Sequence, residues 1–171
     1  MDSRGFSLIE VLVTIVLLTL GMLGLAALQA RTAIAELEAY QRTQALALAQ
    51  DMADRLAGNK ANAAGYVGDD YGSSPNAACG PGAGLSFDRC VWNNALRGAA
   101  EQLAGRNVGT LLNGRGCVTQ RDAQSYWIVV SWQGLSPTLA PTLECGATLY
   151  GSEAMRRTVA LPIRLADLSG T

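Results

Sequence analysis

The sequence lacks histidine altogether and contains a single lysine, Lys60, among its 171 residues. Histidine is the commonest general base and a frequent ligand of zinc and iron, so its absence removes the usual residues of most hydrolase and metalloenzyme sites. No other catalytic group set stands out, and we expect neither an enzyme nor a cofactor. Asp69 and Asp70 lack the alternating oxygen ligands of a calcium loop, so we expect them to be solvated and predict no metal site.

A clustered positive surface is also lacking. The chain carries 13 Lys and Arg residues against 14 Asp and Glu residues, and the basic residues are scattered along it. A nucleic-acid-binding domain has a basic patch or stripe that neutralises phosphates. We therefore expect no nucleic-acid partner, although a module that captures DNA or a surface ligand remains a rival from another functional class.

The four cysteines, Cys79, Cys90, Cys117 and Cys145, form no CxxC pair of the kind that zinc sites favour. All four lie beyond the long apolar segment near the N-terminus, which we interpret as a membrane anchor. An even number of cysteines in that position indicates disulfides in an oxidising periplasm. Sequence alone leaves the pairing open. We favour Cys79 with Cys90 and Cys117 with Cys145, because sequence neighbours close small loops. Four reduced core cysteines are the alternative.

Residues 11–30 contain no charged side chain. About twenty helical residues at about 1.5 Å each span about 30 Å, the thickness of the hydrocarbon core of a bilayer. The apolar run follows the short polar start MDSRG and is longer than the core of an ordinary secretory signal. Arg4 on the near side favours a cytoplasmic N-terminus. We expect residues 6–30 to be a transmembrane helix in the inner membrane.

The same helix is predicted to continue through residues 31–57, which contain no proline or glycine. A spacing of three and four residues places one largely apolar stripe on a single face. Glu38 with Arg42 and Asp51 with Arg55 lie four residues apart, as solvated ion pairs on a helix surface would. The stripe consists of Ile34, Leu37, Gln41, Ala45, Leu48, Met52 and Leu56. We expect the sheet of the globular domain to pack against this stripe.

Residues 58–171 are predicted to form a periplasmic globular domain. Residues 58–84 are rich in Gly, Asn, Ala and Ser, which indicates a long loop. A second helix is predicted over residues 88–104, with Asp88 as its cap. Three strand signals then indicate an antiparallel meander, and Pro162 places the last strand at an edge or a bulge. The strands are expected at residues 116–120, 126–133 and 157–165. The fold class is therefore α+β, with one long N-terminal helix packed on a small antiparallel sheet.

The residues GFSLIEVLV, at positions 5–13, carry the most specific pattern in the chain. A short leader ends in Gly5, Phe6 follows, Glu10 comes four residues later, and an apolar helix continues. This pattern resembles the processing site of type IV prepilins and type II secretion pseudopilins. The resemblance implies a type IV pilin fold, with residues 1–5 as a leader peptide. It also implies cleavage between Gly5 and Phe6 by a prepilin peptidase, and methylation of Phe6.

Glu10 is the one acidic or basic residue in the predicted membrane helix. A charge near mid-bilayer costs about 2.5–3.5 kcal/mol on insertion scales and less near the interface, so this acid calls for a partner. In the pilin family the equivalent Glu meets the N-terminal amine of a neighbouring subunit and sets the stagger of subunits in the filament. The resemblance assigns this role to Glu10 and the amine to Phe6. A position at the headgroup boundary, in contact with water, is the alternative.

A looser similarity extends beyond the processing site. The run LTLGMLGLAALQ, residues 18–29, is similar to the PilV family of minor pilins, as are Trp92, Leu96, Cys117 and the strand that ends in Trp132. This resemblance implies a subunit that helps to initiate or cap a pilus used in twitching motility and adhesion. Its partners would be other minor pilins, the major pilin and a large tip adhesin. A minor pseudopilin of type II secretion is the rival within the same architecture.

Overall fold

The structure, a computed structural model, describes residues 7–99, 102–104, 106–107, 109 and 111–166. It divides into two compact units, Met1–Leu37 and Glu38–Thr171. The helix α1, Leu8–Gly58, contributes its first part to one unit and its second part to the other. The second unit also contains the sheet and the remaining helices.

The helix α1 is continuous over 51 residues, as the sequence predicted. Between Gly24 and Gly58 it contains neither glycine nor proline, and Ala, Leu, Gln and Glu are all strong helix formers. In its apolar half the hydroxyl of Thr14 donates to the carbonyl of Glu10 at 2.8 Å, which satisfies this polar group within the helix. At the other end Asn59 N donates to Arg55 O at 3.0 Å, one residue beyond the last helical position.

One stripe of α1 is buried in the core of the domain from Gln41 onward. Its members recur every three or four positions, as predicted. The prediction was wrong at the start of the stripe, where Ile34 is 44% exposed and Leu37 is 55% exposed, because no described side chain covers them. The buried residues are Gln41, Ala45, Ala49, Met52, Ala53 and Leu56.

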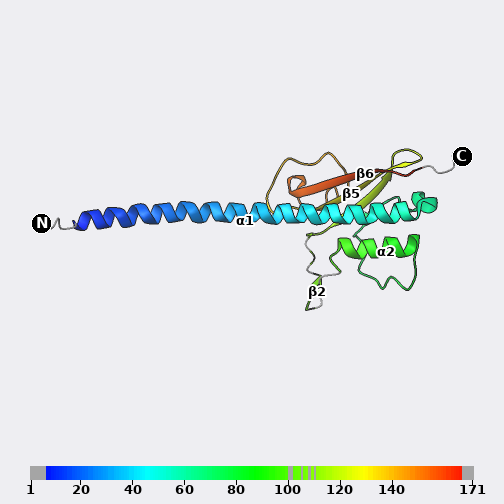
Figure 1. Cartoon of the computed structure of the whole chain (residues 1–171), viewed down its shortest axis with the longest axis horizontal. Helices are drawn as coiled ribbons and strands as arrows, with labels where there is room; N and C mark the ends of the chain where they lie inside the picture. The colour runs from blue at the N-terminus through cyan, green and yellow to red at the C-terminus, as the bar shows by residue number, and fades with distance from the viewer. Residues whose placement is uncertain (1–6, 100–101, 105, 108, 110, 167–171) are drawn as a thin grey trace. The chain divides into compact units, whose positions relative to one another are not determined.

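The core lies between this stripe and one face of a four-stranded antiparallel sheet with the order β1-β4-β5-β6. Figure 1 shows β5 and β6 alongside the C-terminal part of α1. The predicted meander is confirmed to within one residue at each strand end, and Pro162 lies in the edge strand β6, opposite Trp127. The strands are β1 (Gly68–Tyr71), β4 (Arg115–Gln120), β5 (Ser125–Gln133) and β6 (Arg156–Arg164).

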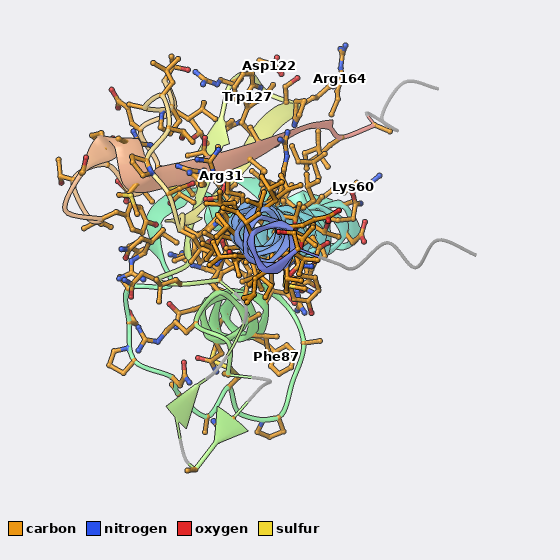
Figure 2. All side chains as sticks on the ribbon, turned by 90° about the vertical axis from the view of Figure 1, so that its left-hand side faces the viewer. Arg31, Lys60, Phe87, Asp122, Trp127 and Arg164 are labelled. Carbon is orange, nitrogen blue, oxygen red and sulfur yellow. A yellow bond between two sulfur atoms is a disulfide. The ribbon has the colours of Figure 1, made fainter. Side chains whose placement is uncertain are left out.

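Side chains alternate between the two faces of β5. Ile128 and Val130 are fully buried on the face toward α1. Trp127 lies on the outer face of the sheet, where Figure 2 labels it. Val129 points the same way and packs with Cys117 and Cys145 in a second, smaller apolar cluster.

The second helix, α2, spans Leu85–Leu96 rather than the predicted residues 88–104. Asp88 is not its cap, because this residue lies in the first turn of α2. Its carboxylate instead accepts hydrogen bonds from Arg55 of α1 and from the Tyr66 hydroxyl. The helix ends before Gly98, whose φ of 70° is the left-handed conformation that commonly follows a helix. A separate hairpin is formed by β2 (Gln102–Leu103), which lies within the end of the predicted helix, and β3 (Arg106–Asn107), which lies beyond it.

The prediction of a long loop over residues 58–84 was wrong in its first part. This part contains a 3-10 helix, η1 (Lys60–Tyr66), and the edge strand β1. Tyr66 and Tyr71 anchor these elements in the core, and the Tyr71 hydroxyl donates to Tyr66 O at 2.7 Å. Two large aromatic residues in an otherwise small-residue segment were the sequence signal for this packing. A further 3-10 turn, η2 (Glu153–Met155), precedes β6.

Both disulfides have the pairing favoured from the sequence. Cys79 bonds to Cys90 and joins the segment after β1 to α2. Cys117 bonds to Cys145 and joins β4 to the connection between β5 and β6. The two bonds close loops with sequence separations of 11 and 28 residues, which limits the freedom of the unfolded chain.

Trp92 connects the helices to the sheet. Its side chain is fully buried, and its indole N–H donates to Leu48 O of α1 at 2.8 Å. Its ring contacts Tyr71 edge to face at 4.8 Å between centroids. The same ring lies directly over Gly116 of β4. The absence of a side chain at Gly116 therefore gives the indole room to pack against the sheet.

We predict that Gly116→Ala destabilises the domain by about 1–3 kcal/mol through overpacking. A Cβ atom at this position would lie 2.3 Å from Trp92 Cη2, and the buried ring has no free space into which to move. Chemical unfolding of the protein in detergent micelles, followed by tryptophan fluorescence, measures the change. Gly58→Ala is the matched control, because an added Cβ meets no atom within 4 Å there. Equal unfolding free energies for the two variants would contradict this packing role.

Candidate functional site

The candidate assembly site is the start of α1. Gly5 and Phe6, the predicted cleavage and methylation residues, lie outside the described residues. Glu10 is exposed in the first turn of α1, where its N–H donates to Ser7 O at 3.0 Å. Within the described part of the chain, its carboxylate has no ion-pair or hydrogen-bond partner. The acid therefore remains open to a group from outside the chain.

The apolar side chains on both sides of Glu10 in the sequence are exposed. Leu8 is 86% exposed and Leu23 is 67% exposed, and the most apolar 18-residue window of α1 is 0% buried. Burying a large aliphatic side chain gains about 1.5–3 kcal/mol, so a solvated state of this segment is strongly unfavourable. Among the described residues, α1 is the one helix long and apolar enough, by length and composition, to cross a membrane. The segment needs lipid or the apolar surfaces of other proteins around it.

Comparison with known protein families finds a match that covers this segment. Residues 1–26 match the family described as the Prokaryotic N-terminal methylation motif. The chain carries a prepilin-type N-terminus. The match includes Gly5, Phe6 and Glu10 and ends within the apolar half of α1, so it does not extend to the domain. No significant match to the chain was found among curated proteins or solved structures.

This signature and the fold agree with each other. A long apolar N-terminal helix continues into a small antiparallel sheet domain, an α+β arrangement consistent with the type IV pilin fold. The motif supports a type IV pilin or pseudopilin in general, and implies processing by a prepilin peptidase and assembly with other pilins. With the apolar helix, it supports anchoring in a membrane and association with a pilus.

A polar clasp attaches the second part of α1 to the domain. Glu38 Oε1 accepts hydrogen bonds from Leu135 N and Ser136 N, each at 3.1 Å, and from Ser136 Oγ at 3.0 Å. Arg157 of β6 forms an ion pair with the same oxygen at 3.2 Å. The predicted pairing of Glu38 with Arg42 was wrong, because this carboxylate turns toward donors about one hundred residues away in the sequence. No periodicity in the helix sequence could have identified those donors.

The clasp favours the ionised form of Glu38. Partial burial alone would raise the pKa of Glu38, but the Ser136 hydroxyl, the Arg157 charge and the two backbone N–H groups outweigh it. The net result is a pKa below the ordinary value of 4.5. A lowered folded-state pKa gives stability that is present above the unfolded-state pKa and is lost as the pH falls through the folded-state pKa.

A second polar network links α1 to α2. The predicted pair of Asp51 with Arg55 is confirmed at 3.0 Å, and the same Arg55 also binds Asp88 at 2.9 Å. The Tyr66 hydroxyl donates to the other oxygen of Asp88 at 2.5 Å. Burial, followed by this bond to a carboxylate, raises the pKa of Tyr66. The network explains why Asp88 lies inside the first turn of α2.

The outer face of the sheet contains a groove of about 820 Å³ beside the disulfide of Cys117 and Cys145. Trp127 is half-buried in its wall, and the Arg121 guanidinium lies 4.7 Å from the centre of its ring. Asp69 is exposed there, as the sequence predicted. Across the described residues, no group of three His, Cys, Asp or Glu side chains could hold a metal ion.

We predict that Glu38→Gln lowers the unfolding free energy at pH 7 by about 1 kcal/mol, because a neutral amide accepts weaker hydrogen bonds from Arg157 and the backbone. The difference from the wild-type protein should shrink as the pH falls from 4.5 through the lowered folded-state pKa of Glu38, where the native carboxylate also becomes neutral. Thermal unfolding of both proteins in micelles, at pH 7 and at a series of lower pH values, measures the difference in stability and its dependence on pH. Glu36→Gln, in an exposed position, is the control. A difference that does not depend on pH would refute the ionised clasp.

Proposed function

We propose that this protein is a minor pilin of a bacterial type IV pilus, most similar to the PilV family. It is made as a single-pass inner-membrane precursor with a periplasmic C-terminal domain. It then enters the filament and helps to initiate or cap it, which supports pilus biogenesis, twitching motility and adhesion. Its role is structural rather than enzymatic.

The observation that carries this proposal is the methylation motif at residues 1–26, on a helix whose first, apolar part is not buried by any of the described residues. In a protein that is soluble after export, such a helix would expose its apolar surface to water, which is unfavourable. A subunit that moves from lipid to a filament core keeps the same apolar surface buried in both places, so one segment serves both states. This exchange is the physical basis of pilus assembly in the proposal.

The proposal divides the chain by task. Residues 1–5 are the leader, residues 6–30 the membrane and filament-core helix, and residues 31–57 the amphipathic part that supports the domain of residues 58–171. After cleavage Phe6 supplies a methylated amine, and Glu10 of a neighbouring subunit binds it. Removing two opposite charges from water is tolerated in an apolar core when they pair with each other.

The main alternative is a minor pseudopilin of type II secretion, because the N-terminal motif serves both systems. The LTLGMLGLAALQ run favours the pilus, together with Trp92, Leu96, Cys117 and the strand that ends in Trp132. Deletion of the gene separates the two assignments. We expect lost twitching motility with normal protein secretion, and the protein should copurify with other minor pilins, the major pilin and a large tip adhesin. Lost secretion with normal twitching would favour the pseudopilin.

We predict that Gly5→Leu blocks processing, because a branched side chain replaces hydrogen at the bond that the prepilin peptidase cleaves. Mass spectrometry of membrane fractions should detect the precursor, which retains residues 1–5, and no chain that begins at Phe6. Ser3→Ala, two residues before the bond, is the control and should be processed normally. Mature protein from Gly5→Leu would show that cleavage occurs elsewhere.

We predict that Glu10→Ala inserts into the membrane at least as well as the wild-type protein, since it removes a charge that costs about 2.5–3.5 kcal/mol near mid-bilayer. Its incorporation into pili should nevertheless fall severalfold, because the Phe6 amine of the neighbour loses its partner. Quantitative immunoblots of membranes and of sheared pili measure the two steps. Glu36→Ala, an exposed acid in the same helix, serves as the comparison. Wild-type incorporation of Glu10→Ala would remove the pairing role.

A further inference from the structure

A pocket of about 330 Å³ lies where α1 enters the domain. Glu38, Ala39 and Arg42 of α1 form one side of it, and Trp132 and Arg157 of the sheet form the other. All of these residues belong to the unit Glu38–Thr171. The pocket is therefore a property of the folded domain.

The charges around this pocket do not balance. Arg157 is already bound to Glu38, to Ser136 O and to Ala154 O, so its donors are engaged. Arg42 is exposed, and none of the described residues forms an ion pair or a hydrogen bond with its guanidinium. One acid faces two arginines, which leaves an excess positive charge at Arg42.

The sheet contributes a second unused donor. Trp132 is 3% exposed, and its indole N–H is buried without an acceptor in the described part of the chain. A buried N–H without a partner costs about 1–3 kcal/mol, and most such groups in proteins are paired. The other buried indole, Trp92, follows this rule through its bond to Leu48 O. Trp132 borders a pocket that an acceptor could enter.

We propose that this pocket binds a carboxylate side chain of a neighbouring pilin subunit. The carboxylate pairs with Arg42 and accepts the hydrogen bond of the Trp132 indole. A guanidinium and an N–H donor suit an acidic oxygen ligand, whereas a cation would be repelled by the excess positive charge. The assignment of a neighbouring subunit as the source of the carboxylate rests on the proposed function, since the N-terminal motif implies assembly with other pilins.

The binding chemistry can be tested without a pilus. The full-length protein in detergent micelles, with ¹⁵N-labelled tryptophan, gives three indole signals, and Trp132→Phe identifies the relevant one. Titration with N-acetyl-glutamate amide should shift the Trp132 signal saturably, while the uncharged N-acetyl-glutamine amide should not. Arg42→Gln should weaken the apparent affinity by about tenfold or more. A Trp132 signal that responds to neither probe, or equally to both, would overturn the site.

The matched control is Arg164→Gln. Arg164 is an exposed arginine at the end of β6, visible at the edge of the sheet in Figure 2, and it does not line the pocket. The affinity of the Arg164→Gln variant for the glutamate probe should equal that of the wild-type protein. An equal loss of affinity in Arg42→Gln and Arg164→Gln would show that binding depends only on the net charge of the protein, which would contradict a specific site.

The source of the carboxylate is tested in cells. Arg42→Glu should reduce incorporation into sheared pili severalfold at equal membrane levels, and Arg164→Glu should not. Normal incorporation of Arg42→Glu would overturn the neighbouring subunit as occupant, even if the micelle titration succeeds. If the wild-type protein is absent from pili, the proposed function fails instead, and the indole titration still decides whether the pocket binds carboxylates.

Discussion

The uncovered apolar surface of the first part of α1 is the constraint on which the rest of the structure depends. From Leu8 to beyond Leu28, large aliphatic side chains are exposed on all sides of one helix. Such a surface is stable only in lipid or against similar helices. The domain must therefore be stable without burying this segment, and in the proposed function the segment exchanges lipid for protein neighbours.

The domain meets this requirement by using only the later part of α1. Gln41, Met52 and Leu56 face the sheet, Trp92 joins α2 to both, and two disulfides close the flanking loops. The Glu38 clasp fixes the point at which the helix enters the domain. Next to this clasp, Arg42 and the indole of Trp132 have donors that none of the described residues accepts from. The two proposals place contacts with neighbouring subunits at Glu10 on the helix and at the Arg42 pocket on the domain.

Sequence patterns predicted those parts of the fold that depend on local regularity. The 3.6-residue period predicted the helix α1, and the alternation of side chains predicted β5 and β6. Proximity in the sequence predicted both cysteine pairs. Contacts between segments that lie far apart in the sequence could not be predicted, because no local pattern identifies the partner. Glu38 was assigned to Arg42 because the two are four residues apart, whereas the structure pairs it with Arg157. Asp88 resembled a helix cap, but its partners are Arg55 and Tyr66. The N-terminal motif could be recognised from the sequence because its signal is short and linear, and the family match includes it. The roles of Gly5, Phe6 and Glu10 stay predictions.

The central claim is that the N-terminal helix, once processed, is the filament-core segment of a pilus subunit. Mass spectrometry of the N-terminal peptide from sheared, purified pili tests it most directly. The account predicts that the protein is present and that its chain begins with N-methylated Phe6. Absence from the pilus fraction, or a chain there that still begins at Met1, would contradict it.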